Sequence, residues 1–200
     1  MKNKISGLIV RLAIVLSMLG LGWPEKRPAV LHADDGDWDT PHVAPFVTTP
    51  HEVVSRMLEL AEIKKGDILY DLGSGDGRIV LAAAKIFGIR AVGFEIDPVL
   101  VKDSRQIIKQ AGMEELVEIR EQDIRTIDFS PASVVTMYLY PAANLRLRPV
   151  LMRGLKPGAR VISHDFGMGS WKPDRVEHLE DTAGLSRTIY RWRIAEPPKR

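Results

Sequence analysis

The chain has no cysteine among its 200 residues, so it forms no disulfide, holds no metal through a thiolate and uses no cysteine nucleophile. It also lacks a large excess of charge of one sign, because 28 Lys and Arg residues face 26 Asp and Glu residues. A net charge of +2 excludes a surface that binds nucleic acid or anionic lipid over its whole extent, so any such site must be local. The 45% of hydrophobic and 27% of charged residues are typical of a folded domain and exclude disorder, collagen and a coiled coil.

The first forty residues differ from the rest of the chain. Basic residues precede an apolar run, Leu12–Trp23, and Ala33 and an acidic segment follow it. This order is typical of a secretory signal peptide or an uncleaved membrane anchor, and it predicts membrane association through residues 5–23. Arg11 fits the positive flank better than the span, because an arginine at the centre of a bilayer costs about 2.5–3.5 kcal/mol. We expect residues 1–40 to be a targeting segment with a linker, with cleavage and the side of the membrane left open, and residues 41–200 to form the domain.

Strand-like and helical segments alternate from residue 41 onward. The apolar pattern predicts strands at 68–72, 91–96, 117–120, 133–140 and 160–166, and helices at 50–61, 78–87, 98–111 and 142–155. Thr49 is the expected N-cap of the first helix, with Pro50 and Glu52 in its first turn. The alternation predicts a doubly wound α/β domain, in which helices cover both faces of a mostly parallel sheet. Two further strand-like runs, 176–179 and 187–194, lie too close together for a crossover helix, so we expect an antiparallel pair at one sheet edge.

A glycine-rich segment, Asp71-Leu72-Gly73-Ser74-Gly75-Asp76-Gly77, follows the first predicted strand. In a sheet of this kind, ligands bind beyond the carboxyl ends of the strands, and glycines let the backbone approach them closely. The Gly-x-Gly-x-Gly spacing differs from the Gly-x-Gly-x-x-Gly of dinucleotide-binding proteins, and the carboxylates of Asp71 and Asp76 would repel a pyrophosphate. The same carboxylates would attract an ammonium or a sulfonium group. The alternative interpretation is a tight turn that happens to carry acidic residues.

Two more acidic residues lie at the ends of the next two predicted strands. Glu95 lies twenty positions after Gly75, where a carboxylate accepts hydrogen bonds from ribose hydroxyls, and Asp123 could accept one from an adenine amine. Taken singly, Glu95 could be a charge at a helix N-terminus, although Asp97 fits that role better, and Asp123 could be a turn residue. Acidic residues at three consecutive strand ends together predict a pocket for S-adenosylmethionine, which is an adenosine with a cationic amino-acid tail.

These residues resemble the class I S-adenosylmethionine-dependent methyltransferases, whose Rossmann-like sheet has seven strands and ends in an antiparallel pair. Residues 45–50, 71–80, 133–139 and 155–164 are similar, more narrowly, to the archaeal protein-lysine methyltransferases and to the mitochondrial enzymes that modify the ATP-synthase c subunit and the adenine-nucleotide carrier. The similarity runs from about residue 45 to about residue 193. It implies that S-adenosylmethionine is the cofactor and that the methyl acceptor is a lysine side chain of a protein.

The resemblance also implies roles for particular residues. Thr48 and Thr49 would close over the methionine end of the cofactor, and Tyr138 would line the opening for the acceptor as the catalytic residue. The cofactor-binding set comprises Thr48, Thr49, Asp71, Gly73, Ser74, Gly75, Asp76, Gly77, Glu95 and Asp123, and no metal is expected. Deprotonating a lysine at pH 7 costs about 4.6 kcal/mol, and burial beside a cation lowers this cost, so a general base is optional. Tyr140, His164, Asp165 and Trp171 are further candidates for the acceptor channel.

Several other functions stay open at this stage. The fourth predicted strand lacks the Asn/Asp-Pro-Pro-aromatic sequence of amide and adenine methyltransferases, which makes those acceptors improbable. The balanced charge argues against RNA, so we expect no nucleic-acid partner, whereas a small-molecule acceptor is compatible with the sequence. The remaining alternatives are an inactive cofactor-binding or membrane-scaffold protein and a nicotinamide oxidoreductase. A membrane anchor would suit a membrane protein as the substrate.

Overall fold

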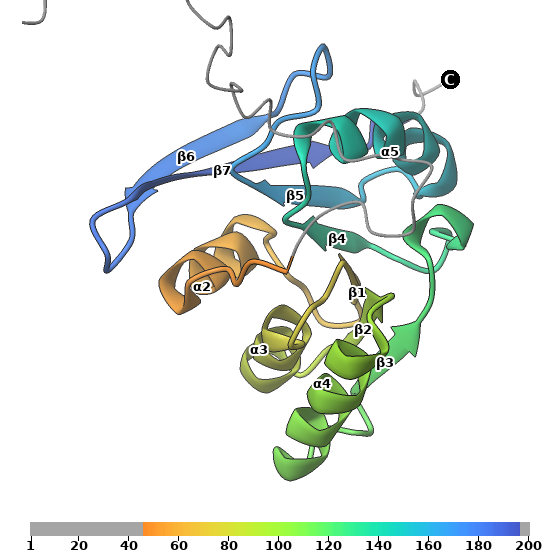
Figure 1. Ribbon diagram of the computed structural model, residues 1–200. Helices are drawn as coiled ribbons and strands as arrows, with labels where there is room; N and C mark the ends of the chain where they lie inside the picture. Colours follow the sequence, from red (N-terminus) through yellow and green to blue (C-terminus); the bar gives the residue numbers. More distant parts are fainter. Residues whose placement is uncertain (1–45, 197–200) are drawn as a thin grey trace, which may run out of the picture. The chain divides into compact units, whose positions relative to one another are not determined.

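The computed structural model describes residues 46–196, and its seven strands form one sheet in the order β3-β2-β1-β4-β5-β7-β6 (Figure 1). Neighbouring strands among the first five are parallel: β1 (Ile68–Leu72), β2 (Arg90–Glu95), β3 (Val117–Glu121), β4 (Val134–Met137) and β5 (Arg160–His164). The last two strands, β6 (Arg175–Glu180) and β7 (Ser186–Arg193), are antiparallel, and β7 lies between β5 and β6. The strand order changes direction between β1 and β4, which is where open α/β sheets bind their ligands.

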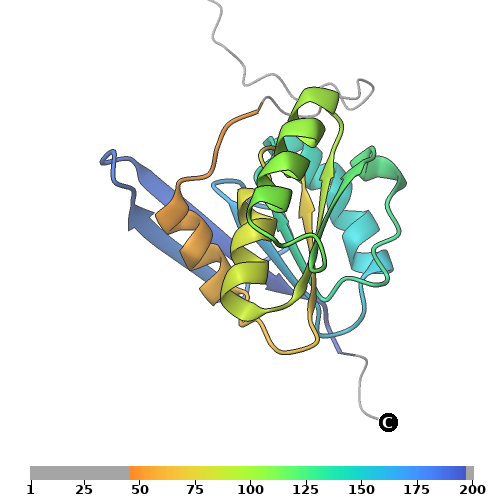
Figure 2. The same ribbon diagram turned by 90° about the horizontal axis from the view of Figure 1, so that it is seen from below.

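Helices cover both faces of this sheet (Figures 1 and 2). Three of them, α2 (His51–Leu60), α3 (Arg78–Phe87) and α4 (Pro98–Gln110), lie on one face, and α5 (Pro141–Gly154) lies on the other. Alternate strand residues therefore enter two separate cores. Leu72 and Met137 pack with Leu147 of α5, whereas Leu69 and Val134 belong to the core of the other face. Burial on both faces explains why these strands read as nearly continuous apolar runs.

The predicted fold class is confirmed, including the antiparallel pair at the end of the chain. The start of the first helix differs from the prediction, because α2 begins at His51 and Thr49 does not cap it. The hydroxyl of Thr49 contacts His164 instead, and a carboxylate oxygen of Glu52 accepts a hydrogen bond from the amide of Thr182. The strands predicted at 133–140 and 160–166 end earlier, at Met137 and His164.

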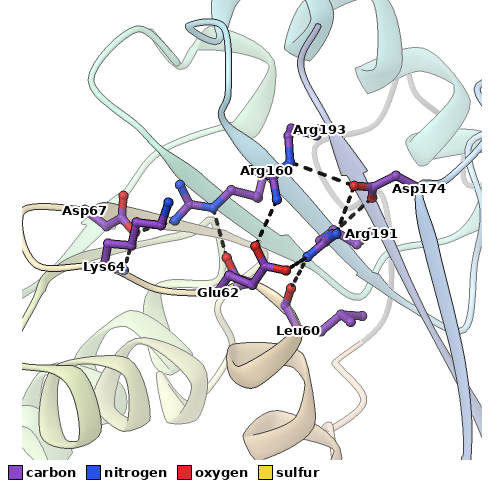
Figure 3. Close-up of polar contacts among 9 residues, drawn as sticks. Leu60, Glu62, Lys64, Asp67, Arg160, Asp174, Arg191 and Arg193 are labelled. Carbon is purple, nitrogen blue, oxygen red and sulfur yellow. Dashed lines mark hydrogen bonds and ion pairs between the residues drawn. The ribbon is translucent and has the colours of Figure 1, made fainter. Parts of the chain in front are cut away.

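An ion-pair cluster fixes the amino end of the sheet, opposite the edge where the cofactor is predicted (Figure 3). The buried Arg160 at the start of β5 donates to the carbonyl of Ala61 at 2.9 Å and pairs with Asp67. The buried Arg191 of β7 donates to the carbonyl of Leu60 at 3.1 Å, to Glu62 and, through two nitrogens, to Asp174. Both arginines therefore bind the C-terminal end of α2 to the last part of the sheet.

Residues 46–196 contain no helix with the length and apolar character that a membrane span requires, and no group of three or more His, Asp and Glu side chains that could hold a metal ion. The predicted targeting segment, residues 1–40, lies outside the described residues.

Candidate active site

The glycine-rich loop joins β1 to α3 at the carboxyl end of the sheet. Gly73, Gly75 and Gly77 have φ values of 71°, 54° and 79°, a left-handed conformation that side chains other than glycine rarely adopt. A Cβ atom on Gly75 would lie 2.5 Å from Cε2 of Phe46, so the bare backbone at this position is closely approached by an aromatic ring. The loop backbone can therefore be approached closely, which is what the glycine spacing predicts.

Four amides of this loop already have partners within the protein. Gly73 and Ser74 donate to the carbonyl of Phe94 at 2.9 Å, and Gly75 donates to Oε2 of Glu95 at 2.8 Å. The amide of Gly77 donates to the carbonyl of Ser74. A phosphate cradle needs amides that point at the ligand, so this arrangement disfavours a nicotinamide dinucleotide. The hydroxyl of Ser74 is buried against β2 and makes no hydrogen bond to a described residue.

Asp71, at the end of β1, is the most perturbed acid of the site. Its side chain is buried, and its Oδ1 accepts a hydrogen bond from the hydroxyl of Thr136 at 2.7 Å. Burial above all raises the pKa of Asp71 to about 7, with a smaller contribution from the negative charges of Glu95 and Asp76, while the Thr136 hydrogen bond opposes the shift. A cation bound nearby would stabilise the ionised carboxylate, so the site favours a positively charged ligand.

Glu95 joins the end of β2 to the glycine loop. Besides the Gly75 amide, its carboxylate accepts hydrogen bonds from the amides of Ile96 and Asp97, at 2.7 and 3.0 Å through Oε1. It is not the cap of α4, because Asp97 takes that role by accepting from the amides of Val99 and Leu100. Glu95 therefore lies beside the loop at the switch point, where a carboxylate meets ribose hydroxyls.

The other two predicted acids have cationic partners of their own. Asp76 is bound by Arg78, whose Nε and Nη2 lie 2.9 and 2.5 Å from the carboxylate oxygens, and Asp123 is bound in the same way by Arg125. These arginines lower the pKa of both carboxyl groups. The uncompensated negative charge is thus concentrated at the ends of β1 and β2, and roles for Asp76 and Asp123 in cofactor binding stay predictions.

Thr49 links the cofactor loop to the end of β5. Its carbonyl accepts a hydrogen bond from Nη1 of Arg78 at 2.8 Å, and its hydroxyl lies 3.2 Å from Nδ1 of His164. His164 is fully buried, and burial lowers its pKa to about 4, an effect that the charge of Asp165 opposes, so the ring is neutral at pH 7. The neighbouring Thr48 is exposed.

Aromatic rings form a wall at the carboxyl ends of β4 and β5. The ring of Tyr138 lies 3.9 Å from that of His164 and 6.1 Å from that of Phe166, measured between centroids. Its hydroxyl is 3.5 Å from Oδ2 of Asp165, which Arg187 also contacts at 3.3 Å. Burial and the charge of Asp165 raise the pKa of Tyr138, so its hydroxyl keeps its proton at neutral pH.

Not every residue predicted for the acceptor channel joins this wall. The structure brings Tyr138, His164 and Asp165 together, whereas Trp171 packs on Trp192 in the core, with 5.7 Å between ring centroids. Tyr140 is the residue before α5, where its side chain makes no capping hydrogen bond. The sequence interpretation missed three neighbours of the site: Phe46 over Gly75, Phe166 beside Tyr138 and Arg187 beside Asp165.

Comparison with known proteins assigns this geometry to a family. A family model described as the ANTKMT methyltransferase domain matches residues 71–175, which span the chain from Asp71 to the start of β6. The chain belongs to this methyltransferase family. The matched range contains the glycine loop, Glu95, Tyr138 and His164.

Relatives of the methyltransferase support the same assignment over most of its length. It is 43% identical to a protein-lysine N-methyltransferase of Saccharolobus islandicus, over 78% of this chain and 96% of that protein. It is 34% identical to the human lysine N-methyltransferase named for the ATP-synthase c subunit, over 76% of this chain and 66% of that protein. A crystal structure described as an RNA methyltransferase from Salinibacter ruber, in complex with S-adenosyl-L-homocysteine, is 54% identical, with a TM-score of 0.71 over 76% of this chain and 97% of that chain.

Proposed function

We propose that this methyltransferase transfers the methyl group of S-adenosylmethionine to the ε-amine of a lysine side chain in a protein. The observation that carries the proposal is the position of a buried acid pair, Asp71 and Glu95, next to a neutral aromatic wall built on Tyr138. The acid pair suits a cationic methyl donor, and the aromatic wall suits an uncharged amine as the acceptor. The similarity to the archaeal protein-lysine N-methyltransferase, which covers 96% of that protein, supports the choice of acceptor.

The residues present fit this cofactor. A positive charge nearby would stabilise the ionised form of the buried Asp71 carboxylate. Glu95 lies where a carboxylate meets ribose hydroxyls. The glycines of residues 73–77 leave room for a ligand beside the backbone. The Salinibacter relative was solved with S-adenosyl-L-homocysteine, which supports the same ligand class. We assign the binding of the cofactor to Asp71, Glu95 and the loop, with Thr48, Thr49 and Asp123 at the periphery.

S-adenosylmethionine supplies a methyl group already activated by its sulfonium. The side chains of this enzyme must therefore orient the acceptor and favour its neutral form. Tyr138 and Phe166 offer apolar ring faces that exclude water from a lysine, and desolvation lowers the pKa of an ammonium group. His164 is neutral and Tyr138 keeps its proton, so neither acts as a strong base at pH 7. We infer that Tyr138 positions the amine and that burial of the lysine ammonium makes it lose its proton.

RNA methylation is a second candidate function. It is favoured by one observation, the 54% identity to a Salinibacter protein described as an RNA methyltransferase. The relatives thus differ in the acceptor that they are named for while sharing the fold, so the acceptor has to be determined directly.

We further propose that residues 1–40 act as a membrane anchor and linker for the enzyme, through the apolar residues 5–23, and that its substrate is a membrane protein. The support is the sequence pattern itself, together with relatives named for the ATP-synthase c subunit and the adenine nucleotide translocase. Fractionation of cells tests the anchor: the full-length chain is expected in the membrane pellet after a high-salt wash, and recovery in the soluble fraction would contradict it.

The decisive experiment incubates the full-length chain with methyl-labelled S-adenosylmethionine and cell extract. The products are divided between protease and ribonuclease treatment, and the modified position is mapped by mass spectrometry. The proposal expects label in a protein lysine that only protease releases, and no label with the Asp71→Asn variant. Label that ribonuclease releases would support the second candidate. Binding of S-adenosylmethionine by calorimetry without any transfer would support the inactive cofactor-binding protein.

A further inference from the structure

The outer side of α5 carries basic and apolar side chains that no described residue covers. We define the α5 outer face as Leu145, Arg146, Pro149, Met152, Arg153 and, just beyond the helix, Lys156, all of them exposed. Residues 145, 149, 152 and 156 recur at helical spacing, and 146 and 153 lie beside them one position further on. Leu145 and Met152 are 44% and 50% exposed, although both are large apolar residues. The face is therefore an apolar stripe flanked by positive charge.

The positive charges of Arg146 and Arg153 have no ion-pair partner within the described residues. No Asp or Glu occurs from Phe129 to His164, a stretch that contains five basic residues, Arg146, Arg148, Arg153, Lys156 and Arg160. Within residues 46–196, Arg146 and Arg153 make no ion pair, while Arg56, Arg78, Arg120, Arg160, Arg187, Arg191 and Arg193 each bind a carboxylate. Two acidic residues lie near the C-terminal end of α5. The charge of Lys156 helps to lower the pKa of Asp128, and a carboxylate oxygen of Glu196 lies 2.9 Å from where a Cβ atom on Gly158 would be.

The position of α5 gives this face an orientation relative to the active site. Of the α-helices in residues 46–196, α5 covers one face of the sheet and α2, α3 and α4 cover the other (Figures 1 and 2). Helix α5 begins at Pro141, three residues after Tyr138, so its N-terminal end adjoins the aromatic wall. Arg148 points to the loop that follows β5, because its Nη1 donates to the carbonyl of Met168 and to the hydroxyl of Ser170 at 3.0 Å. The face thus starts at the acceptor side of the active site and runs away from it.

We propose that the α5 outer face docks on the surface of an anionic lipid bilayer. Arginine and lysine side chains that flank exposed leucine and methionine suit an interface where head groups carry negative charge and acyl chains lie just below. The apolar run at residues 12–23 of the same chain is consistent with a membrane as the partner. RNA fits less well, because α5 contains no aromatic residue on which a base could stack, and Leu145 and Met152 add nothing to a phosphate contact. The proposal does not depend on which acceptor is methylated.

The absence of cysteine makes a site-specific test straightforward. A Met152→Cys variant of the full chain carries an environment-sensitive fluorophore and is mixed with phosphatidylcholine vesicles or with vesicles containing 30% phosphatidylglycerol. A Val99→Cys variant, labelled at a 63% exposed position of α4 on the opposite face, is the matched control. The label at 152 is expected to shift to the blue with anionic vesicles only, and the shift should weaken as salt rises. The label at 99 should not respond, even if the N-terminal segment tethers the chain to the vesicle.

A charge-reversal pair tests the electrostatic part. In the labelled Met152→Cys background, Arg146→Glu with Arg153→Glu should reduce the blue shift with anionic vesicles at least tenfold, whereas Lys85→Glu with Lys102→Glu, the same change of charge on exposed sites of α3 and α4, should leave the shift within twofold. Equal responses of the labels at 152 and 99, or equal losses in the two charge variants, would overturn the proposal. A shift of the label at 152 with RNA and not with vesicles would also overturn it and would assign the face to nucleic acid.

Discussion

The hydroxyl of Thr49 lies 3.2 Å from Nδ1 of His164, across 115 positions of the chain. The other ring nitrogen of His164 is 3.4 Å from a carboxylate oxygen of Asp165, which only accepts hydrogen bonds. Nε2 makes no hydrogen bond to a described residue, and a proton placed on it would face this carboxylate and leave Nδ1 as the acceptor for the Thr49 hydroxyl. Through this bond and the bond from Arg78 to its carbonyl, Thr49 connects the cofactor loop with the aromatic wall.

Removal of this hydroxyl should affect both stability and turnover. Thr49→Val leaves the buried Nδ1 of His164 without a donor, which costs about 1–3 kcal/mol. We expect a lower unfolding free energy in urea, a severalfold lower kcat and a small loss of affinity for S-adenosylmethionine in calorimetry, because Thr49 lies at the periphery of the proposed cofactor site. Thr49→Ser keeps the hydroxyl and should retain most of both properties. Equal defects in the two variants would show that the methyl group, not the hydroxyl, matters.

Substitutions at Tyr138 can separate its ring from its hydroxyl. The ring lies against that of His164, tilted by 36° with centroids 3.9 Å apart, whereas the hydroxyl makes only a 3.5 Å contact with Asp165. Tyr138→Phe should therefore keep kcat/KM within about threefold, because a bond this long is weak. Tyr138→Ala opens the wall to water and should lower kcat at least tenfold. Steady-state kinetics with the lysine substrate make the comparison, and a Phe variant as inactive as the Ala variant would assign the role to the hydroxyl.

Asp71 connects cofactor binding with stability through its pKa. The folded value of about 7 exceeds the ordinary value near 3.8, so the native state binds the proton more tightly and loses stability as the pH rises from about 4 to about 7. Asp71→Asn removes this loss, so the ligand-free variant should gain up to about 4 kcal/mol of unfolding free energy at pH 8. The gain should be small at pH 4, where the carboxyl group is neutral in the native state and only about half ionised in the unfolded state.

The same substitution should abolish cofactor binding, because the neutral amide no longer attracts a cation. Urea unfolding at pH 4 and pH 8 and calorimetry at pH 8 provide the measurements. Asp103→Asn, at an exposed position of α4, is a suitable control and should change neither property. A stabilisation by Asp71→Asn that is independent of pH would contradict the assigned pKa.

The ion-pair cluster of Figure 3 contains a buried and an exposed arginine that can be compared. The side chains of Arg160 and Asp67 are only 7% and 10% exposed, whereas those of Arg193 and Glu62 are 38% and 48% exposed. Arg160→Met leaves Asp67 and the carbonyl of Ala61 buried without their partner, and should cost about 3–5 kcal/mol. Arg193→Met should cost less than about 1 kcal/mol. Urea unfolding of both variants tests this difference, and similar losses would contradict it.

Sequence periodicity and breakers were sufficient to predict most of the fold. The strand at 68–72 and the helix at 78–87 have the predicted bounds, because an apolar run that ends in glycines and a helix that follows them leave little choice. The predicted N-cap of α2 was wrong, because the hydroxyl of Thr49 forms a tertiary hydrogen bond with His164 instead. No pattern near Thr49 in the sequence indicates this partner.

The site was predictable where the strand order brings its residues together. Asp71 and Glu95 end two adjacent strands, so their proximity follows from the topology. The ion pairs of Asp76 with Arg78 and of Asp123 with Arg125 were missed, although the partners are two residues apart. Their spacing in the sequence does not show whether the two side chains point toward each other. Arg187 contacts Asp165 because β7 pairs with β5. The two residues are 22 positions apart, and their spacing in the sequence does not predict this contact.

The insertion of β7 between β5 and β6 also bears on synthesis of the protein on the ribosome. Of the seven strands, β7 is translated last, and its Arg191 adds a contact to the end of α2 beside that of Arg160. A nascent chain that stops before Ser186 has neither the centre of its antiparallel sheet nor this contact. The antiparallel part of the native sheet can therefore form only after β7 has left the exit tunnel.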